Sequence, residues 1–455
     1  MLPIVTPEEM RLVDAAAIEG AEVLVARAGA AVARSAVRMM GGTYGRTVNI
    51  IVGKGNNGAD GRVAGERMQS RGVKVRVFDA GDCPSSLPPA DLVIDAAYGT
   101  GLHGEWQPPD VGGVPVLAVD ISSGVDGLTG QLCGRVLPAV ATVTLGALKP
   151  GLLLPPGAGV AGVVEIAEIG LRAAATEHAR ANLVQASDVA QWLPRRDASA
   201  HKWRAAVRVV AGSPSMSGAA ALVSLAAMRA GAGMVHLSSP GGVLPDIPTE
   251  VVQRELPDEA WGAEVVASTD RFHALVIGPG LGRDDDTTAQ IRAVVLDAQL
   301  PMVIDGDGLF AVGWDKSDAS VLLRRRTAPT VLTPHDGEYA LLTGAKPSAD
   351  RFDAARRLAD ATGCIVLLKG STSVVAEPSG NVLAVTSGDA RLATAGTGDV
   401  LAGIIGALLA AGVPAFQAAA AGAWLHGQAA NCAPAFGMIA SDIAEHLPSV
   451  WADLS

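Results

Sequence analysis

The sequence of 455 residues is poor in the residue types that hold small secreted or zinc-binding domains together. Its four cysteines show no CxxC or Cys/His spacing and stand at Cys83, Cys133, Cys364 and Cys432. Neither a disulfide framework nor a zinc site is therefore indicated, and reduced thiols in a cytoplasm fit best. Aromatic residues make up 4% and charged residues 18% of the chain, so its cores have to pack through small and branched aliphatic side chains. This composition suits layered α/β domains.

Excess positive charge, a signal peptide and a clear membrane span are also lacking. The formal charge of −11 argues against nucleic acid as the main partner, because phosphate backbones bind basic surfaces. Residues 1–9 have neither the basic nor the apolar region of a signal peptide, so we expect a cytoplasmic protein. The segment 400–424 is nearly uncharged, but Gly412-Val-Pro414 interrupts it, which predicts two buried helices and no membrane partner.

The length and the alternation of strand and helix patterns predict two α/β domains in tandem. A chain of 455 residues corresponds to roughly two or three domains. Strand patterns alternate with helical ones over residues 47–167 and again over residues 206–376, as in parallel sheets covered by helices. We place the first domain at residues 1–174, a polar linker at 175–182 and the second domain at 183–455.

A glycine-rich turn follows the first strand of the first domain. Gly53-x-Gly55-x-x-Gly58, with Asp79 about twenty residues further on, nominally matches the fingerprint of a dinucleotide-binding dehydrogenase. Two features argue against a dehydrogenase. This turn carries polar side chains where the fingerprint mostly needs bare backbone, and a second turn at residues 99–104 fits the same pattern without room for a crossover helix.

Oxygen-bearing side chains also stand at the ends of neighbouring predicted strands. Asn57, Asp95 and Ser123 each bring an oxygen to this edge, and amide, carboxylate and hydroxyl oxygens are the ligands that hard cations prefer. The alternative is structural: Asn57 caps the helix that follows it, and residues 122–126 form an ordinary turn. The spacing alone does not choose between a cation site and a turn.

The second domain is organised around the turn Gly396-Thr-Gly-Asp399, which runs into a long apolar helix. Unpaired backbone N–H groups at a helix start attract anions, and glycines let a phosphate approach the main chain. Asp399 would then face a ligand, or else it is simply a capping acid. Lys369-Gly-Ser-Thr-Ser373 ends another predicted strand with an ammonium and hydroxyls suited to nucleotide phosphates, although the chain has no Walker loop.

Four motifs of the first half together resemble the NAD(P)H-hydrate epimerase domain: GNNGADG at 55–61, DAAYGTG at 95–101, VDISSGVDG at 119–127 and Lys149-Pro-Gly151. The resemblance runs from about Thr6 to Leu171 and implies a Rossmann-like three-layer fold. It implies that two segments cradle the damaged dinucleotide: Asn56, Asn57, Gly58, Ala59 and Asp60, then Gly99, Thr100, Gly101, Leu102, His103, Gly104 and Glu105. Asp120 would act beside the nicotinamide ring, and a potassium ion would sit on Asn57, Asp95 and Ser123.

The first half departs from the family pattern at three positions. Ala59 stands where the family usually has glycine, Ser122 stands where it has proline, and His103 occurs in the second glycine turn. Ala59 tests whether a positive φ is required at that position. None of the three removes a ligand that the resemblance implies.

The second half is similar to the ADP/ATP-dependent NAD(P)H-hydrate dehydratase domain, a relative of the ribokinase-like fold, from about Leu183 onward. Its motifs are Gly278-Pro-Gly-Leu-Gly282, the segment 333–338 around His335, Lys369–Ser373 and Gly396–Asp399. The resemblance implies that the hydrated nicotinamide nucleotide lies against Ala219, Gly280, His335 and Asp399. It also implies that ADP, or ATP, lies on Lys369, Gly370, Ser371, Thr372, Ser373 and Gly398. Residues 388–393 depart from the run usual in the family.

The two resemblances imply one repair pathway, with NADHX and NADPHX as substrates. Water added across the nicotinamide C5–C6 bond leaves a poor leaving group, which phosphorylation by ADP would improve, with AMP and phosphate as products. Asp399 would accept the C6 hydroxyl proton, and the first domain would interconvert the (R) and (S) epimers. Magnesium is expected with the nucleotide, and a homo-oligomer is expected. The alternative is a ribokinase-like small-molecule kinase fused to a non-catalytic nucleotide-binding domain.

Overall fold

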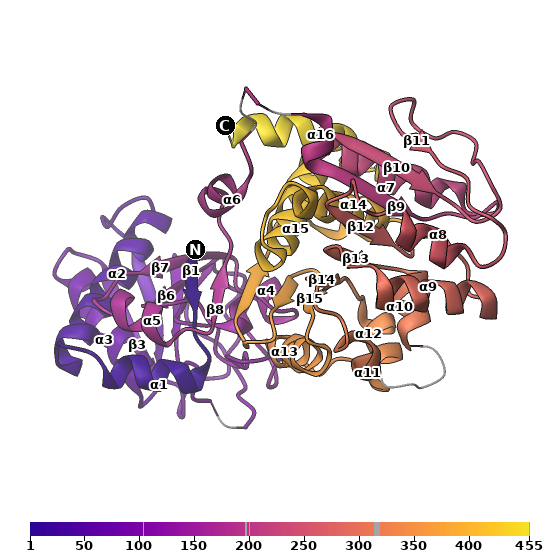
Figure 1. Ribbon diagram of the computed structural model, residues 1–455. Coiled ribbons are helices and arrows are strands. Elements are labelled where there is room, and N and C mark those ends of the chain that lie inside the picture. Colours follow the sequence, from indigo (N-terminus) through magenta and orange to yellow (C-terminus); the bar gives the residue numbers. More distant parts are fainter. Residues whose placement is uncertain (103, 196–197, 200, 314–318, 455) are drawn as a thin grey trace. The chain divides into compact units, whose positions relative to one another are not determined.

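The chain divides into two compact units, one from Leu2 to Asn182 and one from Leu183 onward. The computed structural model describes residues 1–102, 104–195, 198–199, 201–313 and 319–454. Both units are layered α/β structures, which confirms the predicted fold class (Figure 1). The segment predicted as a linker, residues 175–182, holds the end of helix α5 (Arg172–His178) and the start of strand β8 (Ala181–Leu183).

The first unit is built on a parallel sheet. Its strands, and the short strand β1 near the N-terminus, are β1 (Leu2–Ile4), β2 (Thr47–Val52), β3 (Lys74–Asp79), β4 (Leu92–Ala96), β5 (Val116–Val119), β6 (Ala141–Leu145) and β7 (Val163–Ala167). The six strands of the sheet run in the order β3-β2-β4-β5-β6-β7, and each strand pairs in parallel with its neighbours. The chain therefore reverses its direction of winding between β3 and β4, on either side of β2, where parallel sheets bind ligands.

Glycines let the helices of the first unit lie close to this sheet. The helices are α1 (Pro7–Ala15), α2 (Ala21–Met39), α3 (Asn56–Gln69), α4 (Gly157–Val160) and α5, with a 3-10 turn at Pro150–Leu152. A Cβ at Gly61 of α3 would lie 2.6 Å from the Cβ of Ala96, and a Cβ at Gly29 of α2 would lie 2.5 Å from a methyl group of Val63. The start of α3 is thus held against the carboxyl edge of β2 and β4.

The second unit is built on a larger mixed sheet. Its strands are β8, β9 (Ala206–Val210), β10 (Met234–Ser238), β11 (Val252–Gln253), β12 (Ala274–Ile277), β13 (Met302–Ile304), β14 (Thr330–Leu332), β15 (Ile365–Leu368), β16 (Ser373–Ala376) and β17 (Val382–Val385). From β17 to β11 the order is β17-β16-β15-β14-β13-β12-β9-β10-β11. The strands from β15 to β11 pair in parallel, whereas β16 and β17 form antiparallel neighbours at one end.

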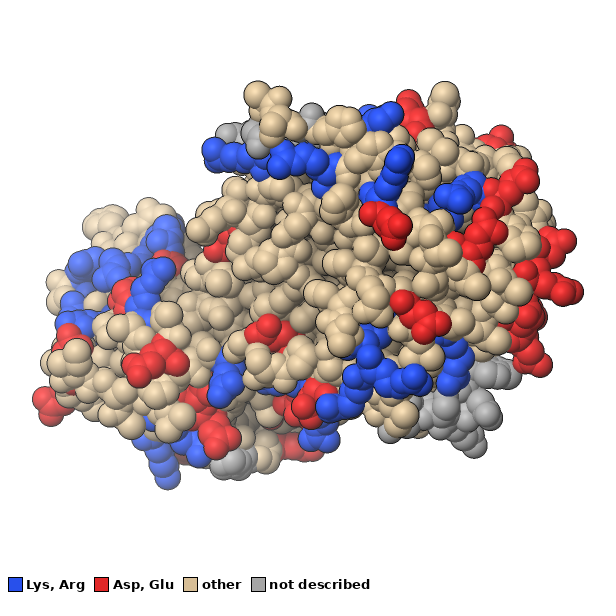
Figure 2. All heavy atoms as spheres, in the orientation of Figure 1, with Lys and Arg blue, Asp and Glu red and all other residues tan. Residues whose placement is uncertain are grey.

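Helices cover the second sheet. They are α6 (Ala186–Trp192), α7 (Ser217–Arg229), α8 (Trp261–Ala267), α9 (Asp285–Asp297), α10 (Asp307–Gly313), α11 (Ala319–Leu323), α12 (Asp336–Thr343), α13 (Arg351–Thr362), α14 (Thr397–Ala410), α15 (Ala415–Cys432) and α16 (Ala440–Asp453), with 3-10 turns at Lys202–Ala205 and Ala390–Leu392. Helices α7, α14, α15 and α16 share one hydrophobic core with strands β9, β12 and β13. Acidic side chains gather on the surface around α8 and α9 (Figure 2).

The apolar segment 400–424 forms parts of α14 and α15, so the prediction of two buried helices is confirmed. Among the described residues, no helix is long and apolar enough to cross a membrane. The predicted strands lie within one or two residues of the observed ones, but β17 and the short strands β1, β8 and β11 were not predicted. Each of those three short strands has only two or three residues, too few for a periodic pattern.

The approach of α14 to α7 yields a stability prediction. A Cβ at Gly403 would lie 2.3 Å from the carbonyl oxygen of Val223, which is backbone and has no rotamer to change. We expect Gly403→Ala to destabilise the protein by about 1–3 kcal/mol through overpacking, measured as a lower thermal unfolding midpoint. Gly218→Ala in α7 is the control, since its Cβ would meet nothing within 4 Å. Equal midpoints for the two variants would contradict the prediction.

Candidate functional sites

A cavity of about 710 Å³ lies at the carboxyl edge of the sheet in the first unit. The turns after β2 and β4 and the residues after β3 and β5 contribute to its walls. Most of the substrate-binding residues predicted for this unit line it: Asn56, Asn57, Asp60, Gly99, Thr100, Gly101, Leu102 and Asp120. The lining residues that the structure describes do not include Gly58, Ala59, Gly104 or Glu105, and His103 lies outside the described residues.

The fold accommodates Ala59 and Ser122, the described residues that depart from the family pattern, and it requires the glycine that precedes Ala59. A Cβ at Gly58 would lie only 2.0 Å from the carbonyl oxygen of Gly53, so this glycine is required by the turn. Ala59 lies within α3 and is not among the residues with positive φ, so glycine is not needed there. Ser122 is buried, and its hydroxyl donates to the carbonyl oxygen of Val160 at 3.4 Å.

The oxygen-bearing residues after β2, β4 and β5 form a buried polar group. Helix α3 is capped by Gly55 without a side-chain hydrogen bond, so Asn57 is not its cap. Both polar atoms of the Asn57 carboxamide are buried, and neither has a hydrogen-bond partner. The fully buried Asp95 accepts from the backbone N–H of Ser123 at 2.9 Å and from its hydroxyl at 2.6 Å. Burial raises the pKa of Asp95, although its hydrogen bonds with Ser123 oppose the shift.

Asp120 and Lys149 form an ion pair at the wall of the cavity. One carboxylate oxygen of Asp120, Oδ1, accepts from the Lys149 ammonium and from the backbone N–H of Leu145, the latter at 3.1 Å. Its other oxygen, Oδ2, lies 3.6 Å from the point where a Cβ of Gly99 would stand. Asp120 has a φ of +67°, a conformation that few residues other than glycine adopt. The strand end thus turns one carboxylate oxygen towards the second glycine turn.

The cavity holds a further acid whose proton is retained at neutral pH. Asp60 is 4% exposed, and burial, with a further contribution from the charge of Asp120, raises its pKa to about 8. Lys149 opposes this shift without cancelling it. Asp60 is therefore mostly a neutral hydrogen-bond donor at pH 7, near the ion pair of Asp120 and Lys149. The sequence motifs contained both Lys149 and Asp60, but they did not reveal that the charge of Lys149 acts on the pKa of Asp60.

The second unit places Asp399 in the first turn of α14. The helix begins at Thr397 after the N-cap residue Gly396, whose φ is +88°, and there is no side-chain capping hydrogen bond; Asp399 is instead an acid of the first turn, where its charge favours the helix dipole. Burial and, to a lesser extent, the charge of Asp305 raise the pKa of Asp399 to about 7, against the opposing effect of Lys369. A carboxyl with this pKa accepts protons efficiently near neutral pH.

Lys369 follows β15 and bridges two other acids. Its ammonium lies 2.9 Å from a carboxylate oxygen of Asp305 and 3.6 Å from one of Glu338. Burial lowers the pKa of Lys369, but these two carboxylates outweigh it, and the net shift is upward. A Cβ at Gly398 would lie 3.5 Å from the same ammonium nitrogen. The predicted nucleotide-binding residues at the end of β15 and at the start of α14 are thus neighbours.

Asp305 is a residue that was not predicted for the site. It is 3% exposed, and the hydroxyl of Thr333 donates to its Oδ1 at 2.8 Å. A Cβ at Gly398 would lie 3.7 Å from its other carboxylate oxygen. Its place at the end of the predicted strand 302–305 repeats that of Asp95 and Asp120 in the first unit, and this repetition was the available signal.

The other predicted residues of the second site lie in α7, in the loop after β12, at the start of α12 and between β15 and β16. His335 caps α12, its Nδ1 accepts from the backbone N–H of Gly337 at 3.0 Å, and its side chain is 59% exposed. A Cβ at Gly280 would lie 2.9 Å from the Cβ of Ala219, so these two residues adjoin. Gly370, Ser371, Thr372 and Ser373 connect β15 to β16. Gly370 and Ser371 are exposed, and Thr372 is buried.

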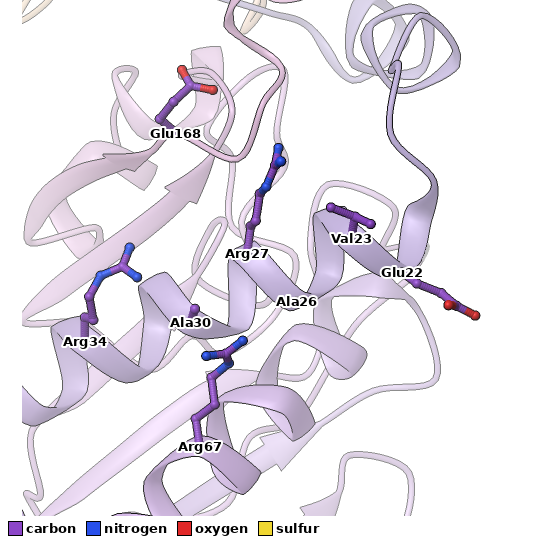
Figure 3. A pocket seen from close by; sticks show the side chains of 8 residues that line it. All are labelled: Glu22, Val23, Ala26, Arg27, Ala30, Arg34, Arg67 and Glu168. Atoms are coloured by element: carbon purple, nitrogen blue, oxygen red, sulfur yellow. The ribbon is translucent and has the colours of Figure 1, made fainter.

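A separate surface hollow of about 480 Å³ lies between α2 and α3 (Figure 3). Arg27 and Arg34 extend from α2 and Arg67 extends from α3, while Glu168 lies on the opposite side. Arg27 is already paired with Glu19 at 2.7 Å and donates to the carbonyl oxygen of Ile169. The three guanidinium groups do not converge on one point, so they do not form a single anion-binding site. We therefore assign no part of the chemistry at the sheet edge to this hollow.

Two family profiles match the chain. The one described as NAD(P)H-hydrate dehydratase covers residues 207–449, and the one described as YjeF-related protein N-terminus covers residues 21–84 and 79–151. A bifunctional NAD(P)H-hydrate repair enzyme of Moorella thermoacetica is 35% identical over 95% of this chain and 92% of its own length. The enzyme so named in Mycobacterium tuberculosis H37Rv is 38% identical over 77% of this chain and 75% of its own.

Solved structures resemble the second unit. The ADP/ATP-dependent NAD(P)H-hydrate dehydratase of Bacillus subtilis, co-crystallised with ATP and Mg²⁺, is 28% identical, with a TM-score of 0.51 over 60% of this chain and 98% of its own. A ribokinase-like protein of Enterococcus faecalis, at 22% identity and a TM-score of 0.52, shows the same fold. The profiles and the full-length relatives together leave one assignment: the chain belongs to the family of bifunctional NAD(P)H-hydrate repair enzymes.

Proposed function

We propose that the first unit interconverts the (R) and (S) epimers of NADHX and NADPHX, and that the second unit dehydrates the (S) epimer with ADP. The observation that carries this proposal is a half-buried acid with a raised pKa, Asp399, in the first turn of α14, where the neighbouring Gly398 adjoins the Lys369 ammonium. In this proposal residues 1–174 form the epimerase, 175–182 the linker and 183–455 the dehydratase, and the division of the chain into two units near Leu183 supports the start of the second domain. The enzyme works in the cytoplasm, and we expect a homo-oligomer, to be measured by light scattering.

The dehydration starts at the hydroxyl on C6 of the hydrated ring. Asp399 accepts its proton, the oxygen attacks the terminal phosphorus of ADP, and the bond from that phosphorus to AMP breaks. Lys369, with the backbone N–H groups at the start of α14, stabilises the charge on the transferring phosphoryl group. Phosphate then leaves C6, a proton leaves C5, and the C5–C6 double bond of NAD(P)H is restored. Ala219, Gly280 and His335 hold the nicotinamide half, while Gly370 to Ser373 and Gly398 hold the nucleotide.

The epimerisation takes place at Asp120. The two epimers differ only at C6, so a bond at C6 has to break and re-form. The Oδ2 of Asp120 moves the hydroxyl proton, and the Lys149 ammonium holds the carboxylate in place through its Oδ1. The two turns, residues 56–60 and 99–105, hold the rest of the dinucleotide.

The buried oxygens beside this cavity fit a potassium ion. The unpartnered carboxamide of Asn57 and the buried, partly compensated charge of Asp95 are stabilised by a hard cation, with Ser123 as the third ligand. The ion would neutralise Asp95 and fix the turn that carries Asn57. Among the described residues, no group of three or more acids, histidines or cysteines forms a metal site. Magnesium is therefore expected to arrive on the nucleotide phosphates.

The base role of Asp399 predicts the pH profile of the dehydratase. Because its pKa is about 7 and only the ionised form accepts a proton, kcat/KM for (S)-NADHX with ADP should fall as the pH drops below 7. Asp399→Asn should lose about 10²- to 10⁴-fold in kcat while ADP still binds. Absorbance of NADH measures the turnover, and calorimetry measures ADP binding. Near-normal turnover of the variant would refute the role.

The charge of Asp305 predicts a shift of that profile. Because Asp305 raises the pKa of Asp399, Asp305→Asn should move the acid limb of kcat/KM to lower pH. Asp336→Asn is the control, since Asp336 is exposed at the start of α12 and pairs with Arg351. A folded Asp305→Asn enzyme with an unmoved limb would show that Asp305 does not tune the base.

The potassium proposal predicts a salt-specific stability. Replacing choline chloride by KCl at constant ionic strength should raise the thermal unfolding midpoint and the rate of epimerisation, because a bound ion stabilises only the folded state. Asp95→Asn should remove both differences. Equal midpoints of the parent protein in the two salts would reject the site.

The reaction products distinguish the proposed repair enzyme from the alternative, a small-molecule kinase. A small-molecule kinase with a non-catalytic first unit would release a stable phosphorylated metabolite and would not interconvert the epimers. The repair enzyme releases NAD(P)H and orthophosphate. Assays with ADP and with ATP also fix which nucleotide is preferred.

A further inference from the structure

The cavity of the first unit extends along the sheet edge to a residue that the epimerisation does not use. Its walls include Asp79 at the end of β3, as well as Gly55 at the start of α3 and Asp120 after β5. The strands stand in the order β3-β2-β4-β5, so Asp79 and Asp120 mark opposite ends of the cavity. Three strand spacings separate their strands, which is about 14 Å.

The start of α3 lies between these ends and fixes the direction of a bound dinucleotide. The helix has 14 residues, begins directly after β2, and has no side chain on its first N–H groups. These free N–H groups bind the pyrophosphate of a dinucleotide, with the exposed Lys54 beside them. With the hydrated nicotinamide at Asp120, the adenosine ribose lies on the other side of α3, at Asp79.

Asp79 offers a hydrogen-bond acceptor at that end. Its Oδ1 accepts from the backbone N–H of Gly81 at 2.9 Å, which fixes the carboxylate, and its side chain is 45% exposed. A ribose 2′-hydroxyl can donate to a carboxylate, whereas a 2′-phosphate has only acceptors and a like charge.

The guanidinium of Arg62 does not reverse the preference of Asp79 for a 2′-hydroxyl over a 2′-phosphate. Arg62 lies 3.9 Å from Asp79 Oδ2, at the outer limit of an ion pair, and its side chain is 49% exposed, so its charge is screened by solvent. Asp82 adds a second negative charge close by, because both Asp79 and Asp82 act on the Cys83 thiol. The adenosine end of the cavity is therefore acidic.

We propose that Asp79 determines the substrate specificity of the epimerase, favouring NADHX over NADPHX by accepting a hydrogen bond from the 2′-hydroxyl of the adenosine ribose. This inference rests on the proposed epimerase function and on the nicotinamide lying at Asp120. A hydrogen bond to a charged group gives about tenfold or greater discrimination in kcat/KM. The discrimination should appear in KM, because Asp79 lies far from C6.

The test uses the full chain without ADP, so that the second reaction cannot proceed. Pure (R)-NADHX and (R)-NADPHX are incubated separately in potassium buffer, and the epimers are separated by chromatography. We expect the parent protein to favour NADHX by at least about tenfold. Asp79→Asn should reduce this ratio at least about fivefold through a lower KM for NADPHX, because Arg62 is then free to bind the 2′-phosphate.

Asp82→Asn is the matched control, because the described lining residues of the cavity do not include Asp82. It should retain most of the parent ratio. Equal kcat/KM values of the parent protein for both substrates, or an unchanged ratio in Asp79→Asn, would overturn the assignment while leaving the epimerase intact. Failure of the parent protein to epimerise either substrate would instead reject the proposed function.

Discussion

Each unit of the protein pairs a lysine with an aspartate that follows a strand, and both candidate sites depend on this pairing. Lys149 is 1% exposed and pairs with Asp120; Lys369 pairs with Asp305 at 2.9 Å. Taking a charge out of water is costly unless a partner and further hydrogen bonds compensate it. The two lysines find that compensation only at the carboxyl edge of a parallel sheet, where strand-end side chains from distant segments converge.

The pairing also separates the roles of neighbouring acids. In the first unit Asp120 forms an ion pair with Lys149, whereas Asp60 has its pKa raised to about 8, mainly by burial. In the second unit Lys369 lies closest to Asp305 and Glu338, and Asp399 keeps a pKa of about 7. Acids with different protonation states in one site are the arrangement that acid–base chemistry requires. The two sheets, which differ in strand order, both achieve this arrangement with a lysine and several aspartates at the carboxyl edge.

The sequence predicted the two α/β units and the turns that carry the sites, because glycine patterns and strand-end acids leave local signals. The turn singled out Asp399 as either a ligand-facing acid or a capping acid, and the structure places it in the first turn of α14 without a capping hydrogen bond. Asp305 was not recognised. Its role depends on Lys369, 64 residues away in the chain, and pairing over such a separation leaves no local pattern. The environment of Asp60 is non-local for the same reason.

The close approach of α14 to α7 bears on how the chain can change over evolutionary time. Gly403 lies one helical turn beyond Asp399, and a side chain there would meet a backbone oxygen of α7. A larger residue at position 403 would push α14 away from α7, and the phosphate-binding turn at the start of α14 would shift with the helix. Selection on the reaction therefore extends to a position that touches no ligand. Because the contact is with the backbone of α7, a different side chain on α7 does not relieve it, and glycine is expected to persist at this position.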